Sequence, residues 1–285
     1  MRAALLTLVL VLSCASSDTE PVATSGTRSY RMGLSPIPPR LSVAEVLRTI
    51  DSVSRHADAA LMVVDVPWKA LLADTSAAQL VRRDNLPIAQ LFRQHGMPIV
   101  ATMELANGLD RSAEAEALVA LGRSITEPAV QRAYREFVAA FDSIVHPDWL
   151  GLAMETNLIR AASKPTVYAA VVTMTNATAA QLHAAGSPAT LMVSVQVETA
   201  WGRLTGSGGG VFVGVAQDRA DFPFVQVLGL SSYPYLGGFA SPEQIPLDYY
   251  SRLAGSPVLP MMVVEGGWSS GSVPGVTSSP DLQAR

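Results

Sequence analysis

Short apolar runs alternate with longer amphipathic stretches along the chain, and this alternation limits its fold more than any other feature. Seven runs of five to seven residues are largely apolar on both faces. Strands of a parallel sheet have this character when helices cover both of its sides. The seven runs are residues 30–34, 59–64, 98–103, 149–154, 191–197, 225–230 and 258–264.

Helical patterns fill most of the gaps between these runs. In residues 42–56, Val46, Ile50 and Val53 recur at the spacing of one helix face, and Ser42 stands at a capping position. Similar stretches are residues 76–95, 126–144, 166–185 and 246–253. Strands and helices in alternation predict either a (β/α)8 barrel or a doubly wound sheet.

Two observations favour the α/β (β/α)8 TIM barrel over the doubly wound sheet. No apolar run leads into a G-x-G-x-x-G sequence or a P-loop, the signatures of the common nucleotide-binding sheets. The runs also end in acidic, aromatic or other polar residues, and in a barrel these ends meet on the face that carries the active site. The residues at these ends are Asp65, Trp68, Glu104, Glu155, Asn157, Glu198, Trp201, Ser232, Tyr233, Glu265 and Trp268.

The sequence contains no clear apolar run for an eighth strand. The seventh run ends near Glu265, and residues 278–283 resemble only the start of a helix. Residues 211–215 are apolar but lie among glycines, which favours a loop. We therefore expect the barrel domain, residues 29–285, to be C-terminally incomplete and truncated before the eighth strand, with two unpaired sheet edges.

The N-terminus has the pattern of an export signal. Residues 3–12 are apolar except for Thr7, and ten residues span only about 15 Å as a helix, half of a bilayer core. The single cysteine, Cys14, follows in Val-Leu-Ser-Cys, which resembles the bacterial lipobox. The resemblance implies a lipoprotein signal peptide over residues 1–14, with Cys14 lipidated, and a flexible tether over residues 15–28. The alternative is an ordinary signal peptide that contains a cysteine.

Composition excludes several classes of function. The chain is 49% hydrophobic and 15% charged, which is too apolar for a disordered protein. Its 20 basic residues against 24 acidic ones include no basic run, so we expect no nucleic-acid partner. One cysteine and four scattered histidines predict neither a disulfide framework nor a metal site, and we expect no cofactor.

Two glutamates, Glu155 and Glu265, each end an apolar run. Glycoside hydrolysis uses such a pair, one carboxylic acid to protonate the leaving oxygen and one carboxylate at the anomeric carbon. A separation of about 5–5.5 Å gives retention of configuration. Burial and mutual repulsion would raise the pKa of one member of the pair.

The sequence resembles the clan A glycoside hydrolases, whose catalytic glutamates follow the fourth and seventh barrel strands. Residues 265–269, Glu-Gly-Gly-Trp-Ser, are similar to the E-[TS]-G-W-P motif of endo-β-1,3-glucanases and endo-β-1,4-galactanases. Residues 147–158 look like the fourth strand of these enzymes, and residues 231–235 look like the sixth. The resemblance implies that Glu155 is the acid/base and Glu265 the nucleophile.

The resemblance also implies that Tyr233 orients the nucleophile. It departs at Met154, because these enzymes carry Asn before the acid/base to bind the sugar 2-hydroxyl. Asn157 lies two residues beyond Glu155, and side chains alternate along a strand, so Asn157 does not simply replace that Asn. Candidate substrate-binding residues are Tyr233, Trp268, Asn157, Trp201, Glu198, Trp68 and Glu104. The tryptophan rings suit stacking on a sugar, and the alternative for them is ordinary packing. The alternative for Glu104 and Glu198 is pairing with a neighbouring arginine.

The expectation is a monomeric, lipid-anchored bacterial protein of the cell envelope, periplasmic or on the surface. It would hydrolyse a β-linked, galactan- or glucan-like poly- or oligosaccharide with retention. A second hypothesis is a carbohydrate-binding lipoprotein with a degenerate, inactive barrel, which Met154 motivates. A third is a barrel enzyme of another kind, with Glu104 or Glu198 as its base.

Overall fold

The computed structural model describes residues 29–204, 210–273 and 275–285. The predicted signal peptide, the lipobox residue Cys14 and the tether over residues 15–28 lie outside the described residues. Contacts divide the chain into two units, Met1–Arg31 and Met32–Arg285, and the fold below is that of the second unit.

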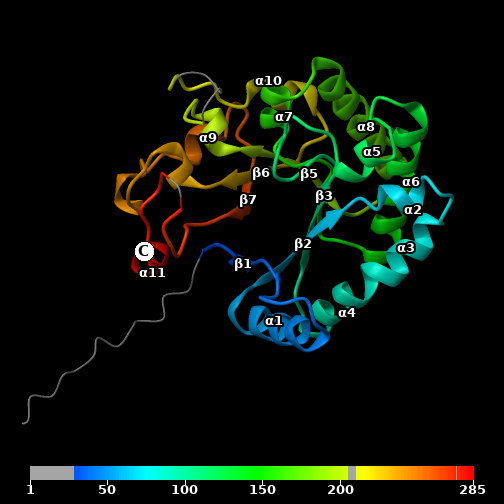
Figure 1. Ribbon diagram of the computed structural model, residues 1–285, viewed down its shortest axis with the longest axis horizontal. Helices are drawn as coiled ribbons and strands as arrows, with labels where there is room; N and C mark the ends of the chain where they lie inside the picture. Colours follow the sequence, from blue (N-terminus) through cyan, green and yellow to red (C-terminus); the bar gives the residue numbers. More distant parts are fainter. Residues whose placement is uncertain (1–28, 205–209, 274) are drawn as a thin grey trace, which may run out of the picture. The chain divides into compact units, whose positions relative to one another are not determined.

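Seven parallel strands form one sheet in which each strand is hydrogen-bonded to the next one in the sequence. The strands are β1 (Gly33–Leu34), β2 (Ala59–Asp65), β3 (Ile99–Glu104), β4 (Trp149–Gly151), β5 (Thr190–Gln196), β6 (Val227–Ser232) and β7 (Met261–Gly266). The sheet curls with its helices outside, and no pairing joins β1 to β7 among the described residues (Figure 1). This arrangement confirms the predicted α/β barrel fold for these strands.

Helices separate most of the strands. They are α1 (Val43–His56), α2 (Trp68–Leu71), α3 (Ala77–Asp84), α4 (Leu86–Gln94), α5 (Glu116–Ala120), α6 (Pro128–Val145), α7 (Thr156–Ala162), α8 (Pro165–Ala184), α9 (Val197–Ala200), α10 (Ala216–Asp221) and α11 (Pro280–Ala284). Three 3-10 turns, η1 (Pro234–Gly237), η2 (Pro242–Gln244) and η3 (Ser251–Leu253), precede β7. Within the described ranges, no helix combines the length and apolar character needed to span a bilayer.

Prolines and a capping serine set several helix starts. The Ser42 hydroxyl accepts a hydrogen bond from the Glu45 amide (3.3 Å), which begins α1 where the sequence predicted it. The single helix predicted for residues 76–95 is instead two helices, because Pro87 at the start of α4 favours a helix N-terminus over a helix interior. The helix predicted for residues 246–253 is wrong, since only the short turn η3 forms there. Residues 211–215 form a loop, as predicted.

Two apolar layers hold the sheet in place. Outward-facing side chains of the strands, such as Met103 and Leu191, pack with Phe137 and Phe141 of α6 in the main core. Inward-facing side chains form a smaller cluster of Val100, Met192, Val227 and Val264. Because both faces are apolar, the polar groups of the strands are concentrated at the strand ends, where the site lies.

Candidate active site

The carboxyl ends of the strands bring four of the predicted residues to one edge of the sheet. Glu104 ends β3, Glu155 directly precedes α7, Tyr233 directly follows β6, and Glu265 is the last residue but one of β7. Strand register aligns Ser231 with Glu265 across β6 and β7. Hydrogen bonds join Glu104 and Glu155 through Arg111, and a separate hydrogen bond joins Tyr233 to Glu265.

Arg111 joins two of the carboxylates. Its Nη1 donates to Glu104 Oε1 (2.7 Å) and its Nε donates to Glu155 Oε2 (2.8 Å). The second oxygen of Glu155 accepts a hydrogen bond from the Ser231 hydroxyl (2.8 Å). Arg111 and Glu155 are only 6% and 8% exposed, so this ion pair is buried. Burial lowers the pKa of Arg111, but the hydrogen bonds and charges of Glu104 and Glu155 outweigh it and raise that pKa above its ordinary value.

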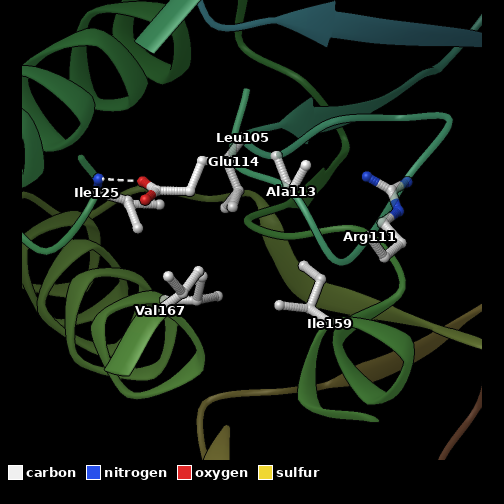
Figure 2. Close-up of a pocket in the computed structure, with 9 residues that line it drawn as sticks. Leu105, Arg111, Ala113, Glu114, Ile125, Ile159 and Val167 are labelled. Carbon is white, nitrogen blue, oxygen red and sulfur yellow. Dashed lines mark hydrogen bonds between the residues drawn. The ribbon is translucent and has the colours of Figure 1, made fainter. Parts of the chain in front are cut away.

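Sequence reasoning missed Arg111, because it lies in the loop between β3 and α5 and belongs to no motif. Its long stem lines a small pocket together with Leu105, Ile125, Ile159 and Val167 (Figure 2). At the far side of that lining, Glu114 Oε2 accepts a hydrogen bond from the Ile125 amide (2.6 Å) (Figure 2). Most of the residues that line this pocket are apolar.

Glu155 has an unusual backbone conformation. Its φ of 49° and ψ of 47° lie in the left-handed region, which costs a non-glycine residue roughly 1–2 kcal/mol. Strand β4 stops at Gly151, earlier than the predicted end at residue 154, and the chain turns at Glu155 into α7. The Glu155 amide donates to the Ser194 hydroxyl (2.9 Å) and fixes this turn. Strain of this kind, held by surrounding contacts, is characteristic of functional positions.

Glu265 is half-buried beside Tyr233, whose hydroxyl donates to its Oε1 (2.8 Å). Burial raises the pKa of the Glu265 carboxyl, and the nearby charges of Glu155 and Glu104 raise it further. The Tyr233 hydrogen bond and the Arg111 charge act in the opposite direction, and the net shift is upward. Glu155 follows β4 and Glu265 lies in β7, so both predicted carboxylates stand at the carboxyl edge of the same sheet.

Glu198, a predicted substrate-binding residue, is fully buried. Its carboxylate accepts hydrogen bonds from Gln196 Nε2 (2.5 Å), the Ser232 hydroxyl (3.1 Å), the Tyr233 amide (3.1 Å) and the Tyr249 hydroxyl (2.9 Å). Four donors of the protein itself therefore occupy both oxygens. This placement argues against the predicted substrate contact, and also against Glu198 as a catalytic base, and it makes Glu198 a brace between β5 and β6.

Asn157 is also enclosed, at 2% exposure. Its Nδ2 donates to the Gln196 carbonyl (2.8 Å) and its Oδ1 accepts from the Gln196 amide (2.8 Å). This reciprocal pair fastens α7 to the end of β5. The substrate-binding role predicted for Asn157 does not fit this position, because the amide has its partners inside the protein.

The predicted tryptophan platforms differ in position. Trp68 is 1% exposed and stacks on Tyr134 in the main core, with ring centroids 6.1 Å apart. Trp201 is 8% exposed, stacks on Tyr249 at 5.1 Å and donates from Nε1 to the Tyr249 carbonyl (3.0 Å). Neither ring offers a free face to a sugar, so the prediction for these two is corrected to core packing.

Trp268 differs from the other two tryptophans. It is partly buried, follows β7 and packs edge-on against Tyr235, with ring centroids 5.9 Å apart. Tyr235 in turn packs edge-on against Tyr233 at 6.0 Å. These three residues, Tyr233, Tyr235 and Trp268, form an aromatic cluster that extends from Glu265. Among the described residues, no group of three or more acidic, histidine or cysteine side chains is arranged to hold a metal ion.

Comparison with known proteins shows what this fold resembles. No family model matches the chain, and no curated protein matches it. Solved structures do match: the exo-β-1,4-mannosidase Op5Man5 from Opitutaceae bacterium strain TAV5 is 13% identical, with a TM-score of 0.58 over 85% of this chain and 46% of that chain. A β-glucosidase from Exiguobacterium marinum is 8% identical, with a TM-score of 0.51 over 79% of this chain and 67% of that chain.

A D-allulose 3-epimerase from Methylomonas sp. also matches, at 13% identity and a TM-score of 0.46 over 87% of this chain and 77% of that chain. The chain spans about half the length of the mannosidase. Identities this low establish the fold alone. The chain therefore has the TIM-barrel fold that these glycosidases share, and its chemistry has to be argued from its own residues.

Proposed function

We propose that this chain is a retaining glycoside hydrolase acting on a β-linked, galactan- or glucan-like poly- or oligosaccharide. The observation that carries the proposal is the pair of carboxylates at one edge of the sheet, Glu155 just beyond β4 and Glu265 near the end of β7. The Tyr233 hydrogen bond on Glu265 adds the orienting contact that the resemblance implied.

In this reaction, Glu265 attacks the anomeric carbon and forms a glycosyl ester while Glu155 gives its proton to the departing oxygen. Water then breaks the ester, with Glu155 taking back a proton and Glu265 released as a carboxylate. Arg111 and Ser231 each donate to one oxygen of the Glu155 carboxylate, the form that takes the proton from water in the second step.

The experiment that tests this proposal is reducing-sugar release from β-galactan, β-glucan, β-mannan and xylan. Wild type is compared with Glu155→Ala and Glu265→Ala, and Glu136→Ala, exposed on α6, is the matched control. We expect one polymer to be cleaved by wild type and the control, and by neither active-site variant. Cleavage that survives in both variants contradicts the proposal.

Azide separates the two roles. With an aryl glycoside that needs no acid to leave, Glu155→Ala should still form the glycosyl ester, and azide should then yield a β-glycosyl azide. Glu265→Ala should yield the α-glycosyl azide by direct displacement, because the nucleophile is gone. The reverse pattern would exchange the roles of the two glutamates.

A second candidate is a carbohydrate-binding protein without turnover. Both oxygens of Glu155 are engaged by donors of the protein itself, and Met154 is 2% exposed where the related enzymes carry a sugar-binding Asn. Calorimetry with the same polymers distinguishes the candidates. Binding by wild type without release of reducing ends, equally strong in Glu155→Gln, supports the second.

We further propose that Cys14 carries a lipid that anchors the protein in the cell envelope. The support is the position of the single cysteine directly behind an export-signal core. Expression of the full chain in a bacterium tests the proposal by membrane fractionation. We expect wild type in the membrane fraction and a processed Cys14→Ser variant in the soluble one, whereas equal release of both would indicate an ordinary signal peptide.

A further inference from the structure

The loop between β3 and α5 is folded so that Arg111 turns back toward the sheet. Asn107 Oδ1 accepts from the amides of Leu109 (2.9 Å) and Asp110 (3.1 Å), and Asp110 Oδ1 accepts from the Ser112 amide (2.9 Å). A short antiparallel bridge between Ala106 and Glu114 closes the loop at its base. These local bonds hold the backbone on both sides of Arg111.

The Arg111 guanidinium makes contacts that a lysine at this position could not reproduce. Nε and Nη1 bind carboxylates from two different strand ends, and Nη1 also donates to the Asn107 carbonyl (3.3 Å). An arginine spans both carboxylates because its donors form a rigid planar fork, whereas the lysine ammonium is a point charge on a flexible stem. Burial strengthens each of these interactions.

We propose that Arg111 is a positioning residue of the active site, which holds Glu155 in place against Glu104 through charged hydrogen bonds and brings a positive charge to the carboxylates at this edge of the sheet. This inference rests on the proposed function of the Glu155 and Glu265 pair. Arg111 acts through these carboxylates and is not itself a catalytic residue.

The charge effect follows from the groups that face Glu265. They are Tyr233 at the end of β6, Glu155 before α7, Glu104 at the end of β3, and Arg111. Burial and the two glutamates raise the pKa of Glu265, and Arg111 is the one positive charge among these neighbours that lowers it. Removing the Arg111 charge therefore raises the pKa of Glu265 further, and the carboxylate form needed for attack appears only at higher pH.

The test compares Arg111→Met, which keeps most of the apolar stem, with Arg111→Lys, which keeps the charge but not the fork. Arg93→Met is the matched control, since Arg93 pairs with Asp148 just before β4, at the opposite end of that strand. The first readout is the carboxyl titration of Glu265 in the full chain labelled with 13C-glutamate, assigned with Glu265→Gln. The second is the pH profile of kcat and KM on the cleaved polymer.

In Arg111→Met, we expect the Glu265 titration and the acidic limb of kcat to move to higher pH. In Arg111→Lys, we expect both to stay near wild type while kcat falls roughly a hundredfold at little change in KM, because Glu155 is no longer held in place. Arg93→Met should match wild type in every readout.

Three results would overturn the inference. They are an unchanged Glu265 titration in Arg111→Met, an equal shift in Arg93→Met, or wild-type kcat in Arg111→Lys. Wild-type kcat in Arg111→Lys would exclude a positioning role for Arg111 even if Arg111→Met fails to fold. If wild type cleaves none of the polymers, the proposed function fails, and the titration still shows whether Arg111 sets the charge state of Glu265.

Discussion

The Tyr233 hydroxyl donates a 2.8 Å hydrogen bond to Oε1 of Glu265 and so connects the end of β6 with the end of β7. The bond favours the charged form of a carboxyl whose pKa is raised by burial and by the neighbouring glutamates. Tyr233 itself has a raised pKa, from burial and from its contact with Glu265, so its proton stays on the phenol and is available for this bond.

Tyr233→Phe should therefore reduce activity most strongly at acidic pH. Loss of the bond raises the pKa of Glu265, so the acidic limb of the kcat/KM profile moves to higher pH. A hydrogen bond to a charged group contributes about 1.5–3 kcal/mol, which predicts a loss of roughly ten- to a hundredfold. Tyr168→Phe is the control. Tyr168 lies on α8, and its hydroxyl donates a 2.6 Å hydrogen bond to the carboxylate of Asp221 at the end of α10. A profile of unchanged shape in Tyr233→Phe would contradict the prediction.

Glu265→Gln should stabilise the protein at neutral pH. A folded-state pKa above the ordinary value of 4.5 means that the folded protein binds a proton that the unfolded chain has already released. Stability therefore falls as pH rises from about the ordinary value through the raised one, and the full cost applies above it. Glutamine stays neutral and removes this cost.

Thermal unfolding between pH 4 and pH 8 checks this prediction. The melting temperature of Glu265→Gln should exceed that of wild type at pH 8, and the difference should shrink toward pH 4. Glu136→Gln, exposed on α6, serves as the control and should follow wild type throughout. A difference that does not vary with pH would show that ionisation of Glu265 is not its cause.

The strands, and the edge of the sheet at which Glu155 and Glu265 stand, could be predicted because both depend on local patterns. Runs that are apolar on both faces identify buried parallel strands, and their ends identify one edge of the sheet. Whether a side chain just beyond a strand end is buried or exposed depends on how the chain turns there, and the hydrophobic pattern does not encode that turn. Trp68, Glu198 and Trp201 lie in or next to the short helices α2 and α9, which turn these side chains inward.

Arg111 was beyond prediction for a different reason. It binds Glu155 across 44 positions of sequence, from a loop shaped by Asn107 and Asp110. No periodicity or motif encodes such a contact, because it depends on the folded path of the loop. The same is true of the left-handed backbone at Glu155, which arises because β4 ends at Gly151.

Glu198→Ala should destabilise the fold strongly. The carboxylate is fully buried and accepts four hydrogen bonds, so its removal leaves several buried donors without an acceptor. We expect a loss of on the order of 3–5 kcal/mol in the free energy of unfolding, measured by urea denaturation. Glu127→Ala removes the partly exposed pair with Arg123 and should cost far less. Similar losses in both variants would show that Glu198 is not the brace inferred here.

Trp268→Ala should lower mainly the affinity for polysaccharide, whereas Trp68→Ala should lower mainly the stability of the fold. Of the two residues, only Trp268 lies in the aromatic cluster beside Glu265. Loss of a stacking ring worth about 0.5–1.5 kcal/mol predicts a drop in polysaccharide affinity of about two- to tenfold for Trp268→Ala, with a smaller loss of stability than in Trp68→Ala because Trp268 is only partly buried. Trp68→Ala opens a cavity in the main core and should cost about 3–5 kcal/mol of stability while leaving the affinity of the folded protein unchanged.

Affinity electrophoresis in polysaccharide gels, paired with urea denaturation of each variant, measures both effects. The comparison holds for a hydrolase and for a binding protein alike, because either must contact sugar before anything else happens. Equal affinity in wild type and Trp268→Ala would move the sugar site away from this cluster. Because the cluster adjoins Glu265, that result would also weaken the case that Glu265 faces a bound sugar at all.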